Sequence, residues 1–218
     1  HFSDLDISIS GIQGKILAGN VTYDIDSNLV GEFNAENILA AVSVGHALGI
    51  DKNAIEAGII NCPAIPGRME SFPLANGATA IVDYAHTPDA YEKVLGTLKE
   101  MSVDDSNIYV VFGAGGDRDA SKRPEMARIA EVFATHCFVT PDNPRTEDPD
   151  QISNEVVAGF SGHEFSLFSN RGEGLKIALD RTAKNDTVVV LGKGREEYQD
   201  IMGEKEFYSD LKIIREYQ

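Results

Sequence analysis

The feature that most constrains the fold of this chain is a series of short apolar segments that alternate with helix-like segments after Pro66. The apolar segments are TAIVDY (79–84), NIYVVFG (107–113), HCFVT (136–140), EFSLFS (164–169) and TVVVLG (187–192). Helical patterns lie between them at 88–101, about 124–134, 151–158 and 172–181. Continuously apolar strands that alternate with helices are typical of a parallel sheet covered on both faces. The sequence therefore predicts an α/β fold with a mostly parallel sheet and helices on both faces.

Residues 1–65 follow a different pattern. Residues 3–10 and 15–26 alternate between polar and apolar side chains and are interrupted by Gly11, Gly14 and the Gly19-Asn20 turn signal. These runs predict antiparallel strands. A helical stripe within 31–50 ends at Gly49, and a second helix is predicted at about 52–60. We therefore expect two domains, at 1–65 and 66–218.

The charge balance excludes several classes of partner. The chain has 19 Lys and Arg against 35 Asp and Glu, a formal net charge of −16. Such a charge disfavours nucleic acid or an anionic membrane as the main partner. No apolar run approaches the roughly 20 residues that span a bilayer, and no signal segment opens the chain. We therefore predict no nucleic-acid partner and no membrane insertion.

Cysteine and histidine usage predicts neither disulfides nor a metal site. Cys62 and Cys137 lack metal or redox spacing, which indicates reduced thiols and a cytoplasmic location. The five histidines are scattered and give no metal-ligand set. The first residue is His1 rather than Met, so we expect the chain to be a piece of a longer protein.

Several charged residues lie in the loops that follow the predicted strands. Open parallel sheets bind their ligands at these loops, beyond the carboxyl ends of the strands. The basic residues in these loops are Arg118, Lys122, Arg123, Arg145, Lys193 and Arg195. Guanidinium groups pair with carboxylates or phosphates, whereas the interleaved Asp142, Asn143 and Glu196 can accept from an ammonium group. The pattern suits a zwitterionic ligand. The alternative is that these loop charges only pair with one another.

Other familiar catalytic patterns are missing from the sequence. The Gly113–Gly116 loop lacks G-x-G-x-x-G, and no acidic ribose reader ends the next strand, which disfavours a dinucleotide site. The chain contains no P-loop and no recognisable Ser-His-Asp or Cys-His arrangement. His86 follows a strand end, where it could contact a phosphate, transfer a proton or be purely structural.

Six motifs nevertheless occur in a distinctive order, namely GEFNAEN, PGRME, VDYAHTPDA, GAGGDRD with KRP, DNPRTEDP and GKGREEYQ. Together they resemble the C-terminal half of a Mur ligase, specifically of the members that add meso-diaminopimelate, and the resemblance covers nearly the whole chain. It implies that 66–218 is the C-terminal, amino-acid-binding domain with a Rossmann-like sheet. It also implies that 1–65 is a remnant of the central ATP-binding domain.

The resemblance further implies an enzyme of peptidoglycan synthesis, a process on which cell shape and division depend. ATP with Mg²⁺ would activate the carboxylate of UDP-N-acetylmuramoyl-L-Ala-D-Glu to an acyl phosphate, which the amine of meso-diaminopimelate attacks. The UDP-sugar domain, the P-loop and the carbamylated lysine that helps to hold Mg²⁺ would all precede His1. We therefore expect a fragment that is inactive by itself and contains no metal ligands.

The motifs also carry over individual residues. The resemblance assigns the amino acid to Arg118, Asp142, Asn143, Pro144, Arg145, Gly192 and Glu196. It assigns the nucleotide to Asn34, Asn37, Arg68, Asp83 and His86. DNPR goes with diaminopimelate in the family, and Arg145 can pair with the carboxylate that lysine lacks.

One departure and two alternatives follow from the same motifs. The last motif usually reads GKGHE, and Arg195 replaces its histidine here. One alternative is a lysine-adding or other peptide ligase of the superfamily, which Arg145 disfavours. The other is a stand-alone, non-catalytic module that binds an amino acid.

The absence of a P-loop generates a first prediction. A mixture of this chain with ATP, Mg²⁺, meso-diaminopimelate and UDP-N-acetylmuramoyl-L-Ala-D-Glu should release no phosphate above background in a colorimetric assay. Phosphate release that depends on all three substrates and scales with the concentration of the chain would contradict this expectation.

Overall fold

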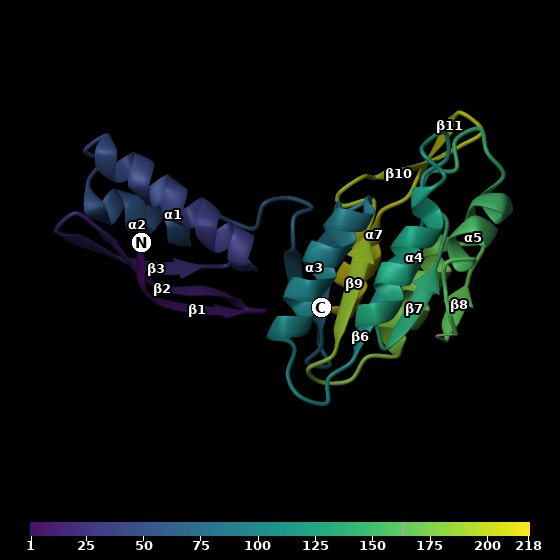
Figure 1. Cartoon of the computed structure of the whole chain (residues 1–218), viewed down its shortest axis with the longest axis horizontal. Helices are drawn as coiled ribbons and strands as arrows, with labels where there is room; N and C mark the ends of the chain where they lie inside the picture. The colour runs from purple at the N-terminus through teal and green to yellow at the C-terminus, as the bar shows by residue number, and fades with distance from the viewer. Residues whose placement is uncertain (163) are drawn as a thin grey trace. The chain divides into compact units, whose positions relative to one another are not determined.

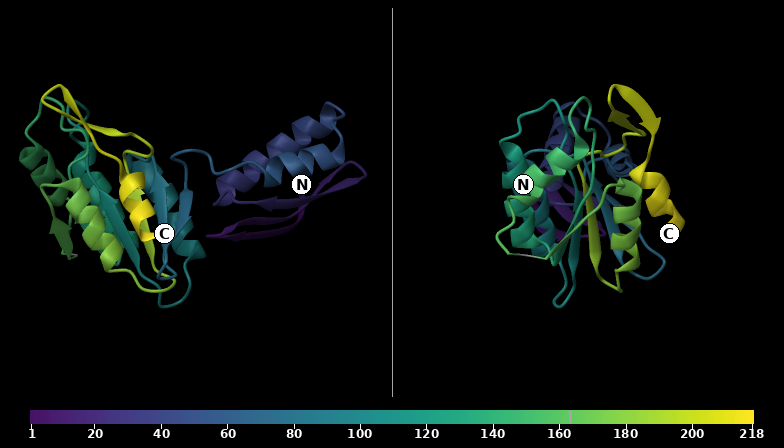
Figure 2. Two further views of the ribbon diagram at one scale, coloured as in Figure 1. Left: turned by 180° about the vertical axis from the view of Figure 1, so that it is seen from behind. Right: turned by 90° about the vertical axis from the view of Figure 1, so that its right-hand side faces the viewer.

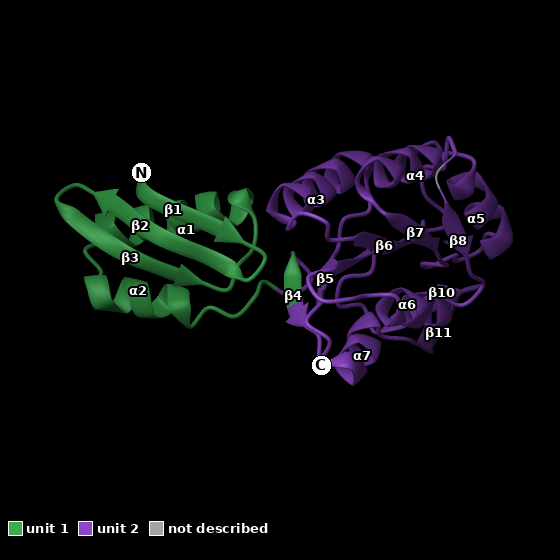
Figure 3. Ribbon diagram, turned by 90° about the horizontal axis from the view of Figure 1, so that it is seen from below, with its two compact units in different colours: residues 1–65, 69–71 green, residues 66–68, 72–218 purple. Residues whose placement is uncertain are grey.

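A computed structural model describes residues 1–162 and 164–218 and shows two compact units, each with its own hydrophobic core (Figures 1 and 3). Unit 1 comprises His1–Ile65 and Met69–Ser71, and unit 2 comprises Pro66–Arg68 and Phe72–Gln218. Among the described residues, every helix is too short or too polar to cross a membrane.

Unit 1 is a three-stranded antiparallel sheet with two helices. The strands β1 (Phe2–Ser8), β2 (Gly11–Ala18) and β3 (Val21–Ser27) lie in the order β1-β2-β3. The helices are α1 (Glu32–Ala47) and α2 (Lys52–Ile60). Sheet and helices share a core of Ile12, Ile16, Tyr23, Ile25, Leu29, Ala35, Ile38, Val42 and Ile55. The predicted antiparallel strands and both predicted helices are confirmed.

One glycine of unit 1 does not break a strand as the sequence predicted. Gly14 lies inside β2, whereas Gly11 is the first residue of β2 and follows the turn at 9–10. A Cβ on Gly14 would collide with the carbonyl oxygen of Asp4, and one on Gly11 would collide with that of Ser27. The neighbouring backbone therefore approaches β2 more closely than a side chain permits. The predicted break at Gly14 was wrong for this reason, whereas the break before Gly11 and the turn at Gly19-Asn20 are confirmed.

The larger sheet has six strands in the order β4-β5-β9-β6-β7-β8 and belongs to unit 2, except for Glu70 and Ser71 of β4, which are assigned to unit 1. Its strands are β4 (Glu70–Pro73), β5 (Thr79–Asp83), β6 (Ile108–Phe112), β7 (His136–Val139), β8 (Phe165–Leu167) and β9 (Thr187–Leu191). From β5 to β8, every neighbouring pair in this order is parallel. The predicted fold class is confirmed.

Helices cover both faces of this sheet (Figures 2 and 3). One face carries α3 (Pro88–Met101), α4 (Lys122–Phe133) and α5 (Pro149–Val157), and the other carries α6 (Arg171–Asp180) and α7 (Asp210–Ile214). The residues of β5, β6, β7 and β9 are almost all buried, as their continuous apolar runs predicted. Thr87, Asp148 and Asn170 cap α3, α5 and α6 by accepting backbone N–H groups.

The sequence predicted neither β4 nor the elements after residue 192. These are the hairpin of β10 (Tyr198–Ile201) and β11 (Glu204–Phe207), the helix α7 and a 3₁₀ turn at Arg215–Tyr217. They are short, and all four residues of β11 are exposed. Elements of three to five residues are too short to show the periodic apolar pattern on which the other assignments depend.

The position of β9 determines which loops lie side by side at the carboxyl ends of the strands. β9 is the last parallel strand along the chain, yet it lies between β5 and β6, with Val190 beside Val82 on one side and Val111 on the other. Because neighbouring parallel strands end at the same edge, the loop after β9 emerges between the loops after β5 and β6.

A buried ion pair between Arg171 and Asp210 connects several elements at this edge of the sheet. Arg171 at the start of α6 is 1% exposed, and its Nη2 lies 3.0 Å from the carboxylate of Asp210. The same guanidinium donates to the carbonyl oxygen of Leu191 at 2.9 Å and to Oγ1 of Thr140 at 3.3 Å. Arg171 thereby joins α6 and α7 to the carboxyl ends of β9 and β7.

This contact set generates a stability prediction. Arg171→Met should lower the free energy of unfolding of unit 2 by about 3–5 kcal/mol, because it leaves the Asp210 carboxylate buried without its partner. Urea unfolding measures the change. The control is Lys176→Met on the same helix, which removes an exposed ion pair with Glu216 and should cost less than about 1 kcal/mol. Equal losses in the two variants would contradict the assignment.

Candidate amino-acid site at the carboxyl ends of the strands

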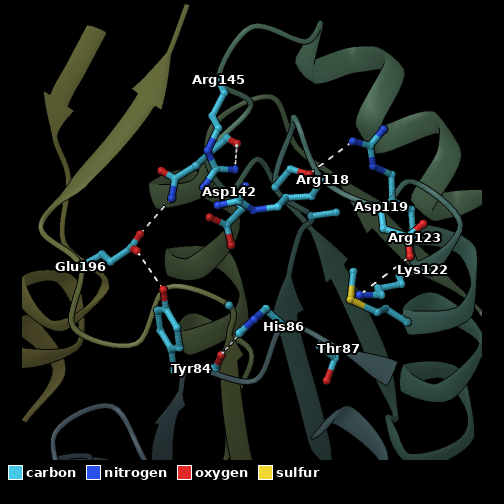
Figure 4. A pocket seen from close by; sticks show the side chains of 15 residues that line it. Tyr84, His86, Thr87, Arg118, Asp119, Lys122, Arg123, Asp142, Arg145 and Glu196 are labelled. Atoms are coloured by element: carbon cyan, nitrogen blue, oxygen red, sulfur yellow. Dashed lines mark hydrogen bonds and ion pairs between the residues drawn. The ribbon is translucent and has the colours of Figure 1, made fainter. Parts of the chain in front are cut away.

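A cavity of about 250 Å³ opens at the carboxyl edge of the sheet in unit 2 (Figure 4). Its lining comes from the loops after β5, β6, β7 and β9 and from the start of α4. The lining residues are Tyr84, His86, Thr87, Ala114, Gly115, Arg118, Asp119, Lys122, Arg123, Met126, Asp142, Asn143, Arg145, Gly192 and Glu196. Sites for drug-sized ligands occupy roughly 300–1,000 Å³, so this pocket suits a molecule the size of an amino acid.

Two of the loops are bonded directly to each other. The Gly116 N–H donates to the carbonyl oxygen of Asn143 at 2.9 Å, and Nη1 of Arg145 donates to the carbonyl oxygen of Gly116 at 2.7 Å. Oγ1 of Thr146 donates to the Asp117 carboxylate at 2.7 Å, and this bond lowers the pKa of Asp117 below its usual value. A Cβ on Gly116 would collide with the carbonyl oxygen of Pro144. The close contact between the loops therefore depends on glycine at this position.

Two arginines line the pocket and have more N–H donors than their own hydrogen bonds use. Arg145 bonds the backbone through Nη1, at 2.7 Å to Gly116 and 3.5 Å to Asn143. Arg118 is exposed and contacts the carbonyl oxygen of Asp117 through Nη1 at 3.4 Å. A guanidinium has five N–H donors, so both side chains retain donors with which to pair with a ligand carboxylate.

Glu196 supplies the opposite charge (Figure 4). Its Oε1 accepts from the Tyr84 hydroxyl at 3.3 Å, and its Oε2 accepts from Nδ2 of Asn143 at 2.9 Å and from Nζ of Lys193 at 3.1 Å. Burial by itself would raise the pKa of Glu196, but the hydrogen bonds and the Lys193 charge outweigh burial and lower it. Glu196 is therefore an ionised acceptor suited to an ammonium group.

Lys193 and Arg123 do not offer their charges to a ligand. Lys193 is 0% exposed, and its ammonium lies 3.0 Å from Oδ1 of Asn143 and 3.7 Å from the carboxylate of Asp142. Arg123 is 2% exposed and pairs with Glu147 and Glu155, at 2.8 and 2.6 Å. For these two residues, the alternative that loop charges pair with one another is correct.

Asp142 is buried beside Lys193 and Arg171. Burial raises the pKa of Asp142, and the positive charges of Arg171 and Lys193 oppose that shift. Gly192, with a left-handed φ of 103°, lies so close that a Cβ would collide with the Asp142 carboxylate. Asp142 thus fixes the loops after β7 and β9 against each other.

Most of the residues that the resemblance assigned to the amino acid gather in this one pocket. Those that line it are Arg118, Asp142, Asn143, Arg145, Gly192 and Glu196. Pro144 lines an adjoining crevice behind the pocket and contacts Gly116 instead. Arg195 is exposed and lies outside the pocket lining. The assignments missed Tyr84, because a tyrosine beside His86 gave no charge signal, and missed the burial of Lys193, because loop lysines are usually exposed.

The residues assigned to the nucleotide are divided between the two units. Asn34 and Asn37 lie on α1 of unit 1, where Asn34 is buried and donates to the carbonyl oxygen of Val30 at 2.8 Å. Nδ2 of Asn37 lies 3.4 Å from Oδ1 of Asn34.

Arg68, Asp83 and His86 belong to unit 2. Asp83 is buried at the end of β5 and accepts from the Ala85 N–H at 2.7 Å, whereas Arg68 is exposed. His86 lines the pocket, with Nδ1 lying 2.8 Å from the carbonyl oxygen of Tyr84. The nucleotide assignments of these residues stay predictions.

Within residues 1–162 and 164–218, no three His, Cys, Asp or Glu side chains are grouped to hold a metal ion. His163, one of the five histidines counted in the sequence, lies outside the described residues.

Comparison with known proteins agrees with this architecture. The family described as "Mur ligase, glutamate ligase domain" matches residues 67–194, more than half of the 218 residues. The chain is 39% identical over 195 residues to the UDP-N-acetylmuramoyl-L-alanyl-D-glutamate–2,6-diaminopimelate ligase of Bacillus cereus, covering 89% of this chain and 39% of that protein. It is 43% identical over 189 residues to the ligase of the same name from Vibrio vulnificus, covering 86% and 38%. The chain thus spans about two-fifths of the length of these relatives.

Solved structures give the same result. A UDP-N-acetylmuramoyl-L-alanyl-D-glutamate–2,6-diaminopimelate ligase matches with a TM-score of 0.75 and 37% identity, over 99% of this chain and 44% of that one. The UDP-N-acetylmuramate-alanine ligase of Thermotoga maritima shares the fold, with a TM-score of 0.63 and 18% identity over 99% of this chain and 44% of that one. The resemblance inferred from the six motifs is thereby confirmed, and the chain belongs to the Mur ligase family.

Proposed function

We propose that unit 2 holds the incoming amino acid of a ligase that adds meso-diaminopimelate to UDP-N-acetylmuramoyl-L-Ala-D-Glu. Unit 1 then corresponds to the C-terminal part of the ATP-binding domain, with the boundary near residue 65. The observation that carries the proposal is the pocket whose lining includes Arg118, Arg145 and the ionised Glu196.

The charges of the pocket complement those of diaminopimelate. This amino acid carries two carboxylates and two ammonium groups. Arg118 and Arg145 can each pair with a carboxylate through parallel hydrogen bonds, and Glu196 can accept from an ammonium group. The lowered pKa of Glu196 suits it to hold an ammonium group rather than to take its proton.

Arg145 is the basis for discrimination against lysine. Lysine has hydrogen where diaminopimelate has its second carboxylate. With lysine bound, Arg145 would lose that partner while its guanidinium stayed partly shielded from water. A site built to pair with a polar group rejects an analogue that lacks the group. This argument disfavours a lysine-adding ligase.

The complete reaction belongs to the whole protein. We infer that ATP and Mg²⁺ serve as cofactors there, that UDP-N-acetylmuramoyl-L-Ala-D-Glu is the second substrate, and that the reaction takes place in the cytoplasm. The names of the relatives support the substrate and the amide-bond chemistry.

The substrate assignment predicts a selective loss in a point variant. By calorimetry, Arg145→Ala should weaken meso-diaminopimelate binding by about 10- to 100-fold, because hydrogen bonds to charged groups contribute about 1.5–3 kcal/mol. Binding of L-lysine should change little. The control is Arg128→Ala, which removes the same charge from an exposed position on α4 outside the pocket.

The other outcomes of this titration are equally informative. Preference for lysine over diaminopimelate would overturn the substrate assignment and favour the lysine-adding alternative. Binding of neither amino acid would show that unit 2 does not form the site without the rest of the protein. Tight binding of many unrelated amino acids would favour a stand-alone binding module.

A substitution of Glu196 should affect the binding of diaminopimelate and of lysine alike. Glu196→Gln should weaken both ligands about equally, because each presents an ammonium group, while Glu92→Gln on the exposed side of α3 should have no effect. In the unsubstituted chain, the lowered pKa keeps Glu196 ionised, so affinity should stay constant from pH 7 to about pH 5 and fall only below the usual glutamate value of about 4.3. A midpoint above pH 5 would contradict the assignment.

A further inference from the structure

The hairpin of β10 and β11 begins two residues after Glu196 and is bonded to the loop after β7 that carries Arg145. We propose that Gln199 on this hairpin is a positioning residue that holds the 141–145 loop, and thereby sets the preference for diaminopimelate over lysine. This inference rests on the proposed function for its ligand, but its structural half can be tested without one.

The backbone of Arg145 is held between two residues of the hairpin. Its N–H donates to the carbonyl oxygen of Asp200 at 2.8 Å, and its carbonyl oxygen accepts from the Met202 N–H at 2.6 Å. Ile201 lies between them as the bridge partner of Arg145. Arg145 has a left-handed φ of 52°, a strained conformation for a non-glycine residue that persists only where neighbouring groups hold it. The hairpin supplies those contacts.

Gln199 extends the same attachment to the beginning of the loop. Its Nε2 donates to the carbonyl oxygen of Asp142 at 2.8 Å and to that of Pro141 at 3.2 Å. The next residue, Asp200, donates its N–H to Oδ1 of Asn143 at 3.0 Å. The hairpin therefore bonds the loop at residues 141, 142, 143 and 145, and Gln199 is the side chain through which it reaches the first two.

The hairpin and the loop depend on each other for order. All four residues of β11 are exposed. Phe207 at the end of β11 is 69% exposed and Met202 in the turn between β10 and β11 is 70% exposed, so the hairpin buries little apolar surface of its own. Isolated two-stranded hairpins are marginally stable at best. On the inner side, the Tyr198 ring faces the ammonium groups of Lys193 and Lys205, at 5.5 and 4.1 Å.

The loop affects ligand specificity because its backbone sets the position of the Arg145 guanidinium. Its Nη1 is bonded to Gly116, so the remaining guanidinium donors point correctly only while the backbone keeps its position. Reacting or binding groups displaced by about 1 Å lose much of their effect. Loosening the loop should therefore weaken the ligand that needs Arg145 more than the ligand that does not.

The test compares Gln199→Leu, which removes both donated bonds, with Gln199→Lys, which keeps a donor at a similar reach. The control is Gln151→Leu, which removes a glutamine bond to Glu155 on the surface of α5. Two quantities are measured: hydrogen–deuterium exchange at the Arg145 and Met202 amides by NMR, and the ratio of diaminopimelate to lysine affinity by calorimetry.

Gln199→Leu should speed exchange at both amides and weaken diaminopimelate binding about tenfold, with less than about a twofold change for lysine, because only diaminopimelate needs the Arg145 guanidinium held in place. Gln199→Lys should restore both quantities, and Gln151→Leu should change neither.

Unchanged exchange in Gln199→Leu overturns the proposal, as does faster exchange with an unchanged affinity ratio. If the unsubstituted chain binds neither amino acid, the proposed function of this chain fails, and the exchange data alone then decide whether Gln199 positions Arg145.

Discussion

The insertion of β9 between β5 and β6 is the constraint on which the candidate site depends. It brings Gly192 and Glu196 to the same edge of the sheet as Arg118 and Arg145, which follow β6 and β7. A parallel neighbour is needed for this, because only parallel strands deliver consecutive loops to one edge. The helices then divide between the faces, with α6 opposite α3 and α4 (Figure 3).

The buried, paired cations of unit 2 hold the loops at this edge of the sheet in the positions that form the pocket. Arg171 joins the ends of β7 and β9, Arg123 joins α4 to Glu147 and Glu155, and Lys193 joins Asn143 to Glu196. A buried charge is tolerated only when it is paired and hydrogen-bonded, so each of these cations specifies one arrangement of its neighbours. Arg118 and Arg145 retain unused donors on the pocket side. The buried cations therefore position the loops of the site, whereas Arg118 and Arg145 can pair with a ligand.

Secondary structure in this chain could be predicted where local signals were strong. The bounds of α2 (Lys52–Ile60) and α3 (Pro88–Met101) agree with the prediction because Asp51 and the Thr87-Pro88 pair mark their starts. The hairpin after Glu196 was not predicted, because its exposed residues lack apolar alternation. Gly14 was misassigned as a strand break, because it lies within β2 where the backbone of Asp4 approaches closely, which no local pattern reveals.

The sequence by itself determined the α/β class, the family and the loops that carry charged side chains, because periodicity and ordered motifs are local properties of the chain. The tertiary structure alone decided the place of β9 in the sheet, the burial of Lys193 and the contact of Gln199 with the loop 58 residues before it. These features depend on pairing between segments far apart in the chain. Whether a loop cation faces a ligand or a neighbouring carboxylate is set by that pairing, since the same residue type serves both purposes.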